Sequence, residues 1–223
     1  TASGTTLTFT TAPPNGVGIE VVFLALPISL PTPGDNTVGL NQLNTTGTPD
    51  GSLFLRDDLV WSGAGGITQG TAVASTSGTS IDFTGIPAGT KRIIFSYSGL
   101  SLNGSSNTMI QLGDAGGFET TGYTGGSGYV GSTGVLMAVY STGFKLLHGE
   151  GATTVVHGIM VLTLLDASTF TWCASNTGQM SDVLFGIIGG GDKSLSAELT
   201  QIRLTTVNGT DTFDAGKVNI QYE

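Results

Sequence analysis

The longest apolar run of the chain, residues 153–165, reads TTVVHGIMVLTLL. A helix needs roughly 20 such residues to cross a bilayer, and this run is shorter and contains His157. From Val155 to Leu165 both alternating faces carry apolar side chains, as in a strand that is covered on both sides. We therefore expect these residues to form a central strand of a β-sheet, with no membrane insertion.

Strand-like segments recur on both sides of this run, roughly every 8 to 14 residues from about Ile67 onward. Turn residues separate them, including the glycine pair at 125–126 and the Gly-Gly-Gly-Asp string at 189–192. In the last segment, Val218 and Ile220 alternate with polar residues, which predicts a strand with one wet face. About ten antiparallel strands of this kind are typical of a β-sandwich or jelly roll. The predicted strands are 79–84, 90–99, 106–113, 117–123, 134–144, 152–165, 169–174, 182–189, 195–206 and 217–222.

The N-terminal residues show the same period of two. Leu7 and Phe9 alternate with threonines, and a Pro-Pro-Asn-Gly turn separates them from an alternating run at 19–23. These are two strands of a hairpin or of a β-arch. A similar unit recurs at 77–97, either as a reused module or by chance.

A connector follows this unit. Pro27, Pro31 and Pro33 stop strand pairing, and Asp35 is placed to cap a short helix. We therefore divide the chain into an N-terminal hairpin segment (1–30), a Pro-rich connector with a short helix (31–65) and a C-terminal β-sandwich (66–223).

Composition limits the classes of function. Of 223 residues, 39% are hydrophobic and 10% charged, so the chain can build a core and is not a disordered polar chain. The formal net charge of −9 argues against a nucleic-acid partner, which needs a basic face. Cys173 is the single cysteine, so no disulfide can form within the chain.

A search for catalytic chemistry finds little. His148 lies in a turn-like string, and His157 shares a strand face with apolar residues, as a hydrogen-bonded core or interface histidine would. No Gly-x-Ser-x-Gly elbow precedes a helix, and the acidic residues lie mostly in or beside turns. We therefore predict a non-enzymatic protein without a cofactor. The carboxylates weighed for a glycosidase pair are Glu119, Glu150, Asp166, Asp192, Glu198, Asp211 and Asp214.

Metal sites are also not expected. No cluster of His or Cys exists, and only the stretch Asn208 to Asp214 offers oxygens at close spacing. It lacks the regular calcium-loop pattern, so two polar turns around Phe213 are the favoured interpretation over a calcium site.

Three stretches carry a resemblance to a known family. The first runs from Ser3 to Val21, the second reads PDGSLFLRDD at 49–58 and closes at Trp61, and the third covers Thr79 to Glu223. The first looks like the last hairpin of the tail-attachment domain in tail fibres of short-tailed bacteriophages. The second is similar to strings between fibre segments, and the third to a C-terminal domain common in phage tail-fibre proteins.

The resemblance implies a virion component, located extracellularly on the phage tail. It implies a homotrimer that contacts other phage tail or virion proteins and binds a glycan of the host surface. A trimer would bury an apolar segment that is too hydrophobic for an exposed linker, with an arginine placed to pair across chains; alternatively, the segment packs on its own C-terminal domain. The candidate interface residues are Leu53, Phe54, Leu55, Arg56 and Trp61.

The leading hypothesis is therefore a tail-fibre protein that attaches to the host cell. Tyr123, Tyr129 and Tyr140 lie in or near Gly-rich segments and are the candidates for stacking on sugar rings, unless they pack in the core or an interface. The alternative is a purely structural virion protein, such as a head fibre, an adaptor or a decoration protein. A polysaccharide-cleaving enzyme is a third hypothesis.

Overall fold

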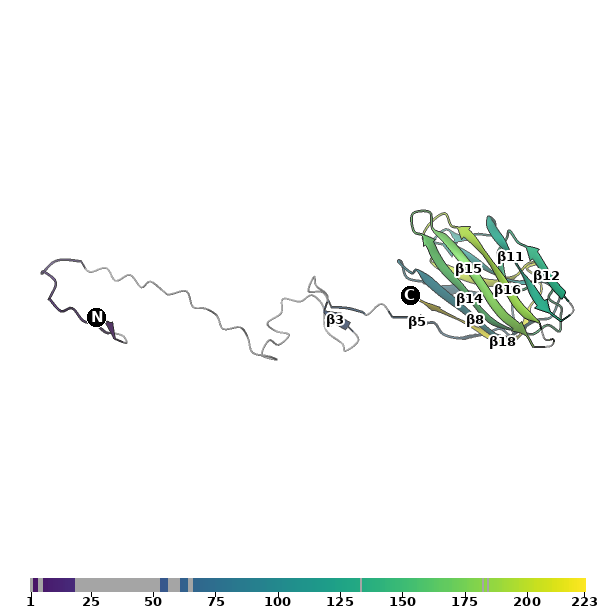
Figure 1. Cartoon of the computed structure of the whole chain (residues 1–223), viewed down its shortest axis with the longest axis horizontal. Coiled ribbons are helices and arrows are strands. Elements are labelled where there is room, and N and C mark those ends of the chain that lie inside the picture. The colour runs from purple at the N-terminus through teal and green to yellow at the C-terminus, as the bar shows by residue number, and fades with distance from the viewer. Residues whose placement is uncertain are drawn as a thin grey trace. The chain divides into compact units, whose positions relative to one another are not determined.

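The computed structural model describes residues 2–3, 6–18, 53–55, 61–63, 66–132, 134–181, 183 and 185–223. The chain divides into two units, Thr1–Ser62 and Gly63–Glu223. The second unit consists of two antiparallel sheets packed face to face, which confirms the all-β sandwich predicted from the sequence (Figure 1). The predicted strand at 19–23, the Pro-rich connector, its short helix and Arg56 lie outside the described residues.

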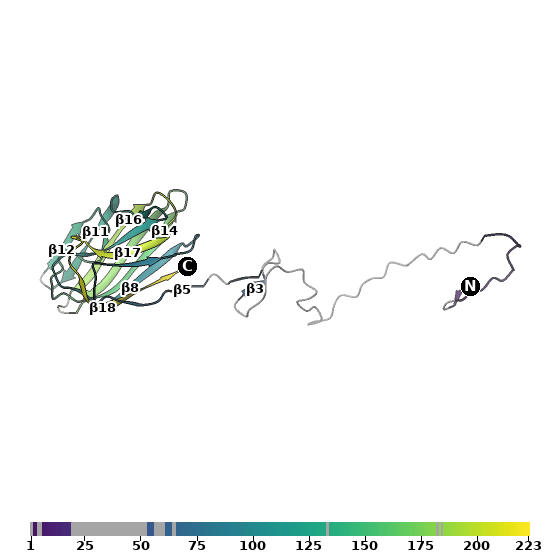
Figure 2. The same cartoon turned by 180° about the vertical axis from the view of Figure 1, so that it is seen from behind.

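The larger sheet has nine strands and forms one layer of the sandwich (Figure 2). The expected central position is confirmed, because β14 pairs with β15 on one side and β8 on the other. The expected cover on both faces is wrong: Ile159 is 42% exposed and Leu165 69%, because the smaller sheet covers only the inner face. In spatial order the strands are β12 (Gly134–Val139), β11 (Tyr123–Gly131), β16 (Gly186–Ser194), β15 (Thr171–Met180), β14 (Val156–Asp166), β8 (Arg92–Leu102), β18 (Phe213–Tyr222) and β5 (Thr68–Gln69), with β6 (Val73–Ala74) also paired to β18.

The smaller sheet has five strands and covers the inner face of the larger one. Its order is β10 (Gly117–Phe118), β9 (Thr108–Asp114), β17 (Gln201–Thr206) and β7 (Ser80–Thr84), with β13 (Phe144–Lys145) also paired to β9. Since β7 and β8 belong to different sheets, the repeated unit at 77–97 forms a β-arch here and not a hairpin.

Apolar side chains from both sheets fill the space between them. Phe95 and Trp172 of the larger sheet and Ile110 and Leu204 of the smaller sheet are each no more than 2% exposed. Phe83 of the smaller sheet packs edge-to-face on Phe95, with ring centroids 6.2 Å apart. The alternation of the sequence therefore maps onto one buried and one exposed face, as the strand β7 shows with its exposed–buried pattern.

Two glycine-rich segments are strands where the sequence predicts turns. Gly125-Gly126 lies inside β11, and Gly189 to Asp192 lies inside β16, paired to it residue by residue. A Cβ at Gly125 would lie 2.3 Å from the carbonyl oxygen of Gly190, and one at Gly191 would lie 2.0 Å from that of Thr124. The glycines are needed because the two strands leave no room for side chains at these positions.

A tyrosine covers each of two glycine pairs on the inner face of the larger sheet. The Tyr140 hydroxyl lies over Gly125 and Gly191 and donates a hydrogen bond to the carbonyl oxygen of Gly190 at 2.8 Å. Farther along the sheet, still on its inner face, the Tyr97 hydroxyl lies over the paired Gly158 and Gly178. These rings supply the apolar surface that the glycines lack, so glycine-rich strands still pack against a core.

The sandwich has two distinct ends. At the entry end, β5 pairs Gln69 with Gln221 of β18, so the chain enters the domain beside its own last residues. We call the opposite side the far end. It carries the turn after β11, the loop that contains Phe185, and the loops at 103–107, 146–155 and 207–212.

The first unit contains short strand pairs. β1 (Ala2–Ser3) pairs with β2 (Thr6–Leu7), so Leu7 joins a tighter hairpin than the sequence predicts, and Phe9 lies outside any strand and is 47% exposed. β3 (Leu53–Leu55) pairs with β4 (Trp61–Gly63), which places both parts of the candidate interface segment in one two-stranded sheet.

Candidate functional site

The three tyrosines predicted for sugar stacking lie in different surroundings. Tyr123 is 2% exposed and Tyr140 is 6% exposed, and both pack on the buried ring of Phe144. The Tyr123 hydroxyl donates to the carbonyl oxygen of Glu119 at 2.9 Å and accepts from the Leu112 N–H at 2.7 Å. Burial raises the pKa of both tyrosines, which keeps the hydroxyls neutral. In this conformation neither ring faces solvent.

Tyr129 differs, because it is half-buried and lies at the far end. Its ring stacks on Phe185, with centroids 4.8 Å apart and an interplanar angle of 15°. Two glycines make room for this pair. A Cβ at Gly131 would lie 1.9 Å from the Phe185 ring, and one at Gly149, where φ is +89°, would approach Tyr129 Cε1 to 3.5 Å. The far end thus presents one ordered aromatic pair.

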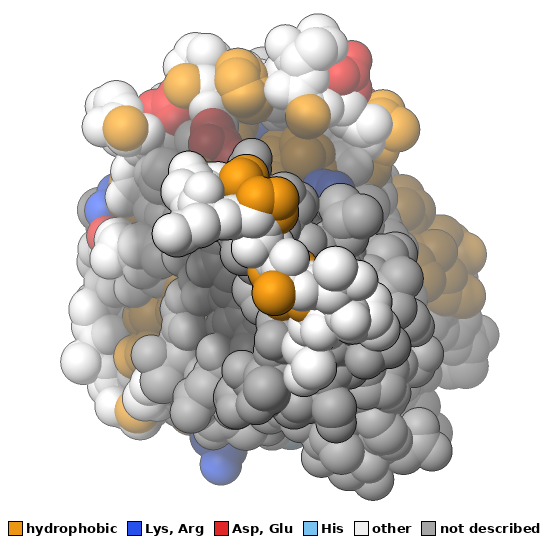
Figure 3. Space-filling model, turned by 90° about the vertical axis from the view of Figure 1, so that its left-hand side faces the viewer, with side chains coloured by type: hydrophobic (Ala, Val, Ile, Leu, Met, Phe, Trp, Pro, Cys, Tyr) orange, Lys and Arg blue, Asp and Glu red, His pale blue; other side chains and the backbone are white. Residues whose placement is uncertain are grey.

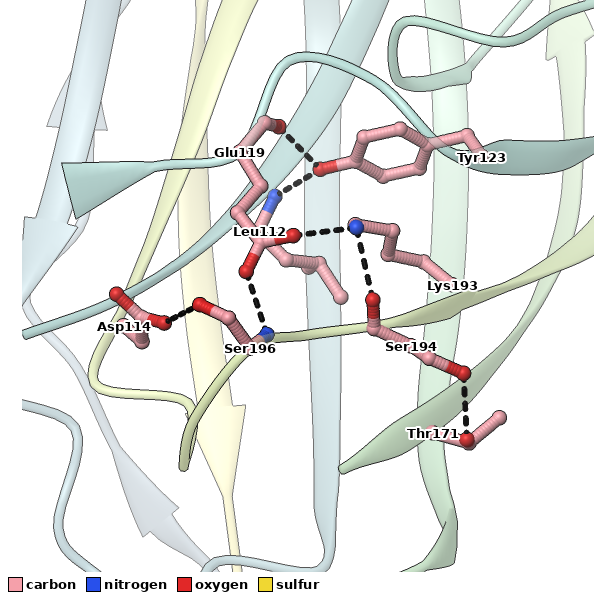
Figure 4. Close-up of polar contacts among 8 residues, drawn as sticks. All are labelled: Leu112, Asp114, Glu119, Tyr123, Thr171, Lys193, Ser194 and Ser196. Carbon is pink, nitrogen blue, oxygen red and sulfur yellow. Dashed lines mark hydrogen bonds and ion pairs between the residues drawn. The ribbon is translucent and has the colours of Figure 1, made fainter. Parts of the chain in front are cut away.

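A polar cluster joins the two sheets at the entry end (Figure 4). The Lys193 side chain of β16 is 6% exposed and forms an ion pair with Glu119, which follows β10. Lys193 also donates to the carbonyl oxygen of Ser194 at 2.8 Å and lies 5.5 Å from the centre of the Tyr123 ring. The second Glu119 oxygen accepts from the Ser196 N–H at 2.6 Å. We call these residues the inter-sheet cluster.

Asp114 of β9 extends the inter-sheet cluster. It accepts hydrogen bonds from the Ser196 hydroxyl at 2.6 Å and the Gly116 N–H at 2.7 Å, and these lower its pKa. Partial burial works against ionisation of Glu119, but the bonds from Lys193 and Ser196 outweigh it and lower its pKa as well. These bonds therefore favour the ionised form of both carboxylates. The cluster joins β9 and the segment after β10 in the smaller sheet to β16 and the segment after it in the larger sheet.

Glu150 is the most perturbed acid. It belongs to the far-end loop 146–155, and its side chain is buried. Its Oε1 accepts hydrogen bonds from the Thr108 N–H at 3.0 Å and from the Thr108 hydroxyl at 2.5 Å. Desolvation outweighs these bonds and the charge of Lys145, and raises the pKa of Glu150 to about 7. A carboxyl with this pKa is a usual sign of an acid–base site. In this protein the hydrogen bonds of Glu150 come from Thr108, and they anchor the loop 146–155 to β9.

The histidines do not meet these acids in a triad. His157 lies on the outer face of β14, half-buried, and its Nδ1 accepts from the Gly99 N–H at 3.0 Å, in line with the predicted hydrogen-bonded histidine. His148 Nδ1 and Ser127 Oγ are buried, and neither has a hydrogen-bond partner in the part of the chain that the structure describes. Within the described part of the chain, neither histidine forms a hydrogen bond or ion pair with an acidic side chain.

Other candidates for a glycosidase pair accept hydrogen bonds within turns or between strands. Asp166 accepts from the Ser168 N–H at 2.8 Å, and Glu198 accepts from the Gly89 N–H at 2.6 Å. Asp192 bonds the Thr124 hydroxyl across two strands. The nucleophile–base–orienter geometry of hydrolases is not formed by these residues.

The stretch Asn208 to Asp214 forms an internally bonded turn. Asn208 Oδ1 accepts from the N–H groups of Thr210 and Asp211 at 3.1 Å, and Asp211 Oδ2 accepts from the Ser106 N–H at 2.8 Å. The first bonds close an Asx turn, and the last ties the loop to its neighbour. Among the described residues, no group of three or more His, Cys, Asp or Glu could hold a metal ion.

Three shallow hollows are found on the domain. One of about 240 Å³ lies at the entry end and is mostly apolar; Trp172 and Leu199 line it, with Phe170 in the left-handed region at φ +50°. The others, of about 290 Å³ and 230 Å³, lie beside β18. On the face drawn in Figure 3, the described acidic and basic side chains are few and scattered.

Sequence reasoning did not find the inter-sheet cluster. Glu119 and Lys193 are 74 positions apart, and each precedes or follows turn residues, where a solvated charge is the usual interpretation. No local signal marked it, because Lys193 directly follows the Gly-Gly-Gly-Asp string that predicts a turn. Its place on the inner face opposite Trp172 appears only in the strand register.

No family model matches the sequence, and neither a curated protein nor a solved structure is significantly similar to it.

Proposed function

We propose that this chain is a phage tail-fibre protein whose C-terminal β-sandwich attaches to a glycan on the host cell surface. The polarity of the domain is the observation that carries the proposal. The first strand of the domain, β5, pairs with its last strand, β18, so both the start of the sandwich and Glu223 lie at the entry end. The loops of the far end lie opposite, and loops carried on a rigid sandwich commonly form binding surfaces.

The far-end aromatic pair supports a glycan as the ligand. Sugar rings bind to proteins through apolar faces laid on aromatic rings, with polar groups at the edges. Tyr129 and Phe185 form such a platform, and their neighbours at this end are polar turn residues such as Asn107 and Asn208. Of the three predicted tyrosines, the proposal therefore retains Tyr129 and places Tyr123 and Tyr140 in the core.

The proposal includes a homotrimer in the virion, joined at Leu53 to Leu55 and Trp61. What supports it is the family resemblance and the apolar character of this segment, whose backbone forms the paired strands β3 and β4. Light scattering on the full chain tests it: the particle mass should be a multiple of three chain masses, each of 22.6 kDa.

Adsorption to host cells and binding to a glycan array test the attachment function. We expect the wild type to bind and Tyr129→Ala to lose binding at least tenfold, because the stacked platform is removed. Tyr222→Ala is the matched control, since Tyr222 is also a half-buried tyrosine but lies at the entry end. Binding by Tyr129→Ala equal to that of the wild type would place the receptor site elsewhere.

A wild type that binds neither cells nor glycans would contradict the attachment function and favour the structural virion protein. Release of oligosaccharide from host capsule or lipopolysaccharide would instead identify an enzyme. The inter-sheet cluster and Glu150 would then be the first carboxylates to replace.

A further inference from the structure

The edge strand β12 is exposed and apolar. It is the last strand of the larger sheet and pairs only with β11. Its sequence, GVLMAV, contains no charge and no proline. Val135 is 64% exposed, Met137 46% and Val139 85%.

The hydrogen-bond phase shows which backbone groups remain open. The Tyr140 N–H donates to the Gly125 carbonyl oxygen at 3.0 Å, so the residues in phase with Tyr140 point toward β11. These are Ala138 and Leu136, because bonding alternates along an antiparallel pair. The N–H and C=O groups of Val135, Met137 and Val139 therefore point away from the sheet, to the open edge.

Among the residues that the structure describes, none of the usual protections covers this edge. Edge strands are commonly shielded by lysines, prolines, bulges or a covering loop, because their open backbone groups pair readily with other strands. The register of β11 and β12 runs without a bulge from Gly126↔Val139 to Gly131↔Gly134. The apolar surface also continues inward over the outer face of the sheet, through Val130 and Ile188, which are 43% and 44% exposed. We call β12 with these two residues the apolar edge.

Charge indicates which partner fits the apolar edge. The chain carries a net charge of −9, so two copies repel each other over most contacts. Residues 123–139, which make β11 and β12, contain no charged side chain. Like-charged copies can therefore approach across this surface without bringing carboxylates together. The other long edge, β7, instead carries the exposed Asp82–Arg203 ion pair.

We propose that β12 pairs antiparallel with β12 of a second copy of this chain, about a two-fold axis at Met137. In this register Met137 lies opposite itself, and Val135 lies opposite Val139 of the other copy. The three open N–H groups and three open C=O groups of each copy then find partners in each other. The side chains of Val135, Met137 and Val139 become cross-strand neighbours on the outer face.

This contact goes beyond the proposed function and does not depend on it. A two-fold contact at β12 is separate from three-fold association through β3 and β4, so it doubles whatever mass the rest of the chain sets. Receptor binding at the far end is measured by adsorption, and the failure of one proposal leaves the other intact.

Light scattering on the full chain over a range of concentrations tests the pairing. We expect Met137→Lys and Val139→Lys each to halve the wild-type mass, because a lysine on both copies places like charges on one strand pair. Val207→Lys is the matched control; Val207 is 43% exposed and lies in the loop before β18, so the same charge is added away from the edge. Equal masses for all four proteins would overturn the proposal.

A cross-linking experiment tests the register without disturbing the fold. In a Cys173→Ser background, Met137→Cys places the thiol opposite the same residue of the second copy. Their Cα atoms would be about 5.5 Å apart, a separation that a disulfide can span. Mild oxidation should link the copies covalently, and Val207→Cys should remain unlinked. Absence of a link at position 137 would overturn the two-fold pairing even if the lysine variants lost mass.

Discussion

Glu150 makes the stability of the domain depend on pH in a direction opposite to most acids. Its pKa rises from 4.5 to about 7 on folding, because burial disfavours the carboxylate more than Thr108 and Lys145 favour it. Between these two values the folded state binds more protons than the unfolded state. The free energy of unfolding contributed by Glu150 is therefore fully present below about pH 4.5, and it is lost as the pH rises through about 7.

The magnitude follows from the two pKa values. At roughly 1.4 kcal/mol for each pH unit, the difference between 4.5 and about 7 corresponds to about 3 kcal/mol of destabilisation at pH 8 relative to pH 4.5. Glu150→Gln removes the ionisation and keeps the Oε1 acceptor for both Thr108 donors. We expect this variant to match the wild type near pH 4.5 and to exceed its stability by about 3 kcal/mol at pH 8.

Urea unfolding at a series of pH values from 4.5 to 8.5 measures this difference. Glu198→Gln is the control, because it removes one negative charge from an exposed side chain of the same acidic protein. The reasoning is refuted if the stability gap between Glu150→Gln and the wild type is the same at pH 5 and pH 8. It is also refuted if Glu198→Gln produces the same gap.

Two further substitutions test the packing of the domain, each by urea unfolding. Gly158→Ala should lower the free energy of unfolding by about 1–3 kcal/mol, because its Cβ would lie 2.4 Å from the Thr177 carbonyl oxygen. Gly186→Ala should change it little, because its Cβ would lie 3.9 Å from the nearest atom, the Val130 carbonyl oxygen. Lys193→Met should lower the free energy of unfolding by about 2 kcal/mol, because it leaves the Glu119 carboxylate without its ion-pair partner. The loss is smaller than the roughly 3–5 kcal/mol of a fully buried pair, since the Glu119 side chain is 23% exposed. Adding Glu119→Gln should recover part of this loss. A neutral Gly158→Ala, or a double variant weaker than Lys193→Met, would contradict these accounts.

Alternation of apolar and polar residues was enough to predict the class of fold. The strands β7, β8, β14 and β18 each carry such a pattern or a fully apolar run, and their existence was predicted to within a few residues. The same argument failed at β11, because glycines carry no hydrophobic signal and pairs of them usually mark turns. The side chain that covers the glycines of β11 on the inner face, Tyr140, follows β12 and does not belong to β11 itself.

The candidate site was less predictable than the fold. Stacking on sugars was assigned to three tyrosines by their neighbourhood in the sequence, but burial depends on which face of a strand each side chain takes. Tyr123 falls on the inner face of β11 at the entry end, where Phe144 and Lys193 enclose it. Tyr129 lies on the same face at the far end, where its side chain is only half-buried. The burial of the two tyrosines therefore depends on their positions along β11, and the alternation of the sequence does not predict this difference.

The glycine-rich strands also explain why the apolar edge is left open. Along β11, four of the nine residues are glycine, so this strand contributes few side chains to either face. The outer face beside β12 is consequently flat and bare, and no bulky neighbour screens Val130 or Ile188. Burial of Val135, Met137 and Val139 must then come from outside the domain, since β11 cannot supply it. The glycines that let two strands approach closely inside the sheet thus create, on its outer face, a surface suited to another strand.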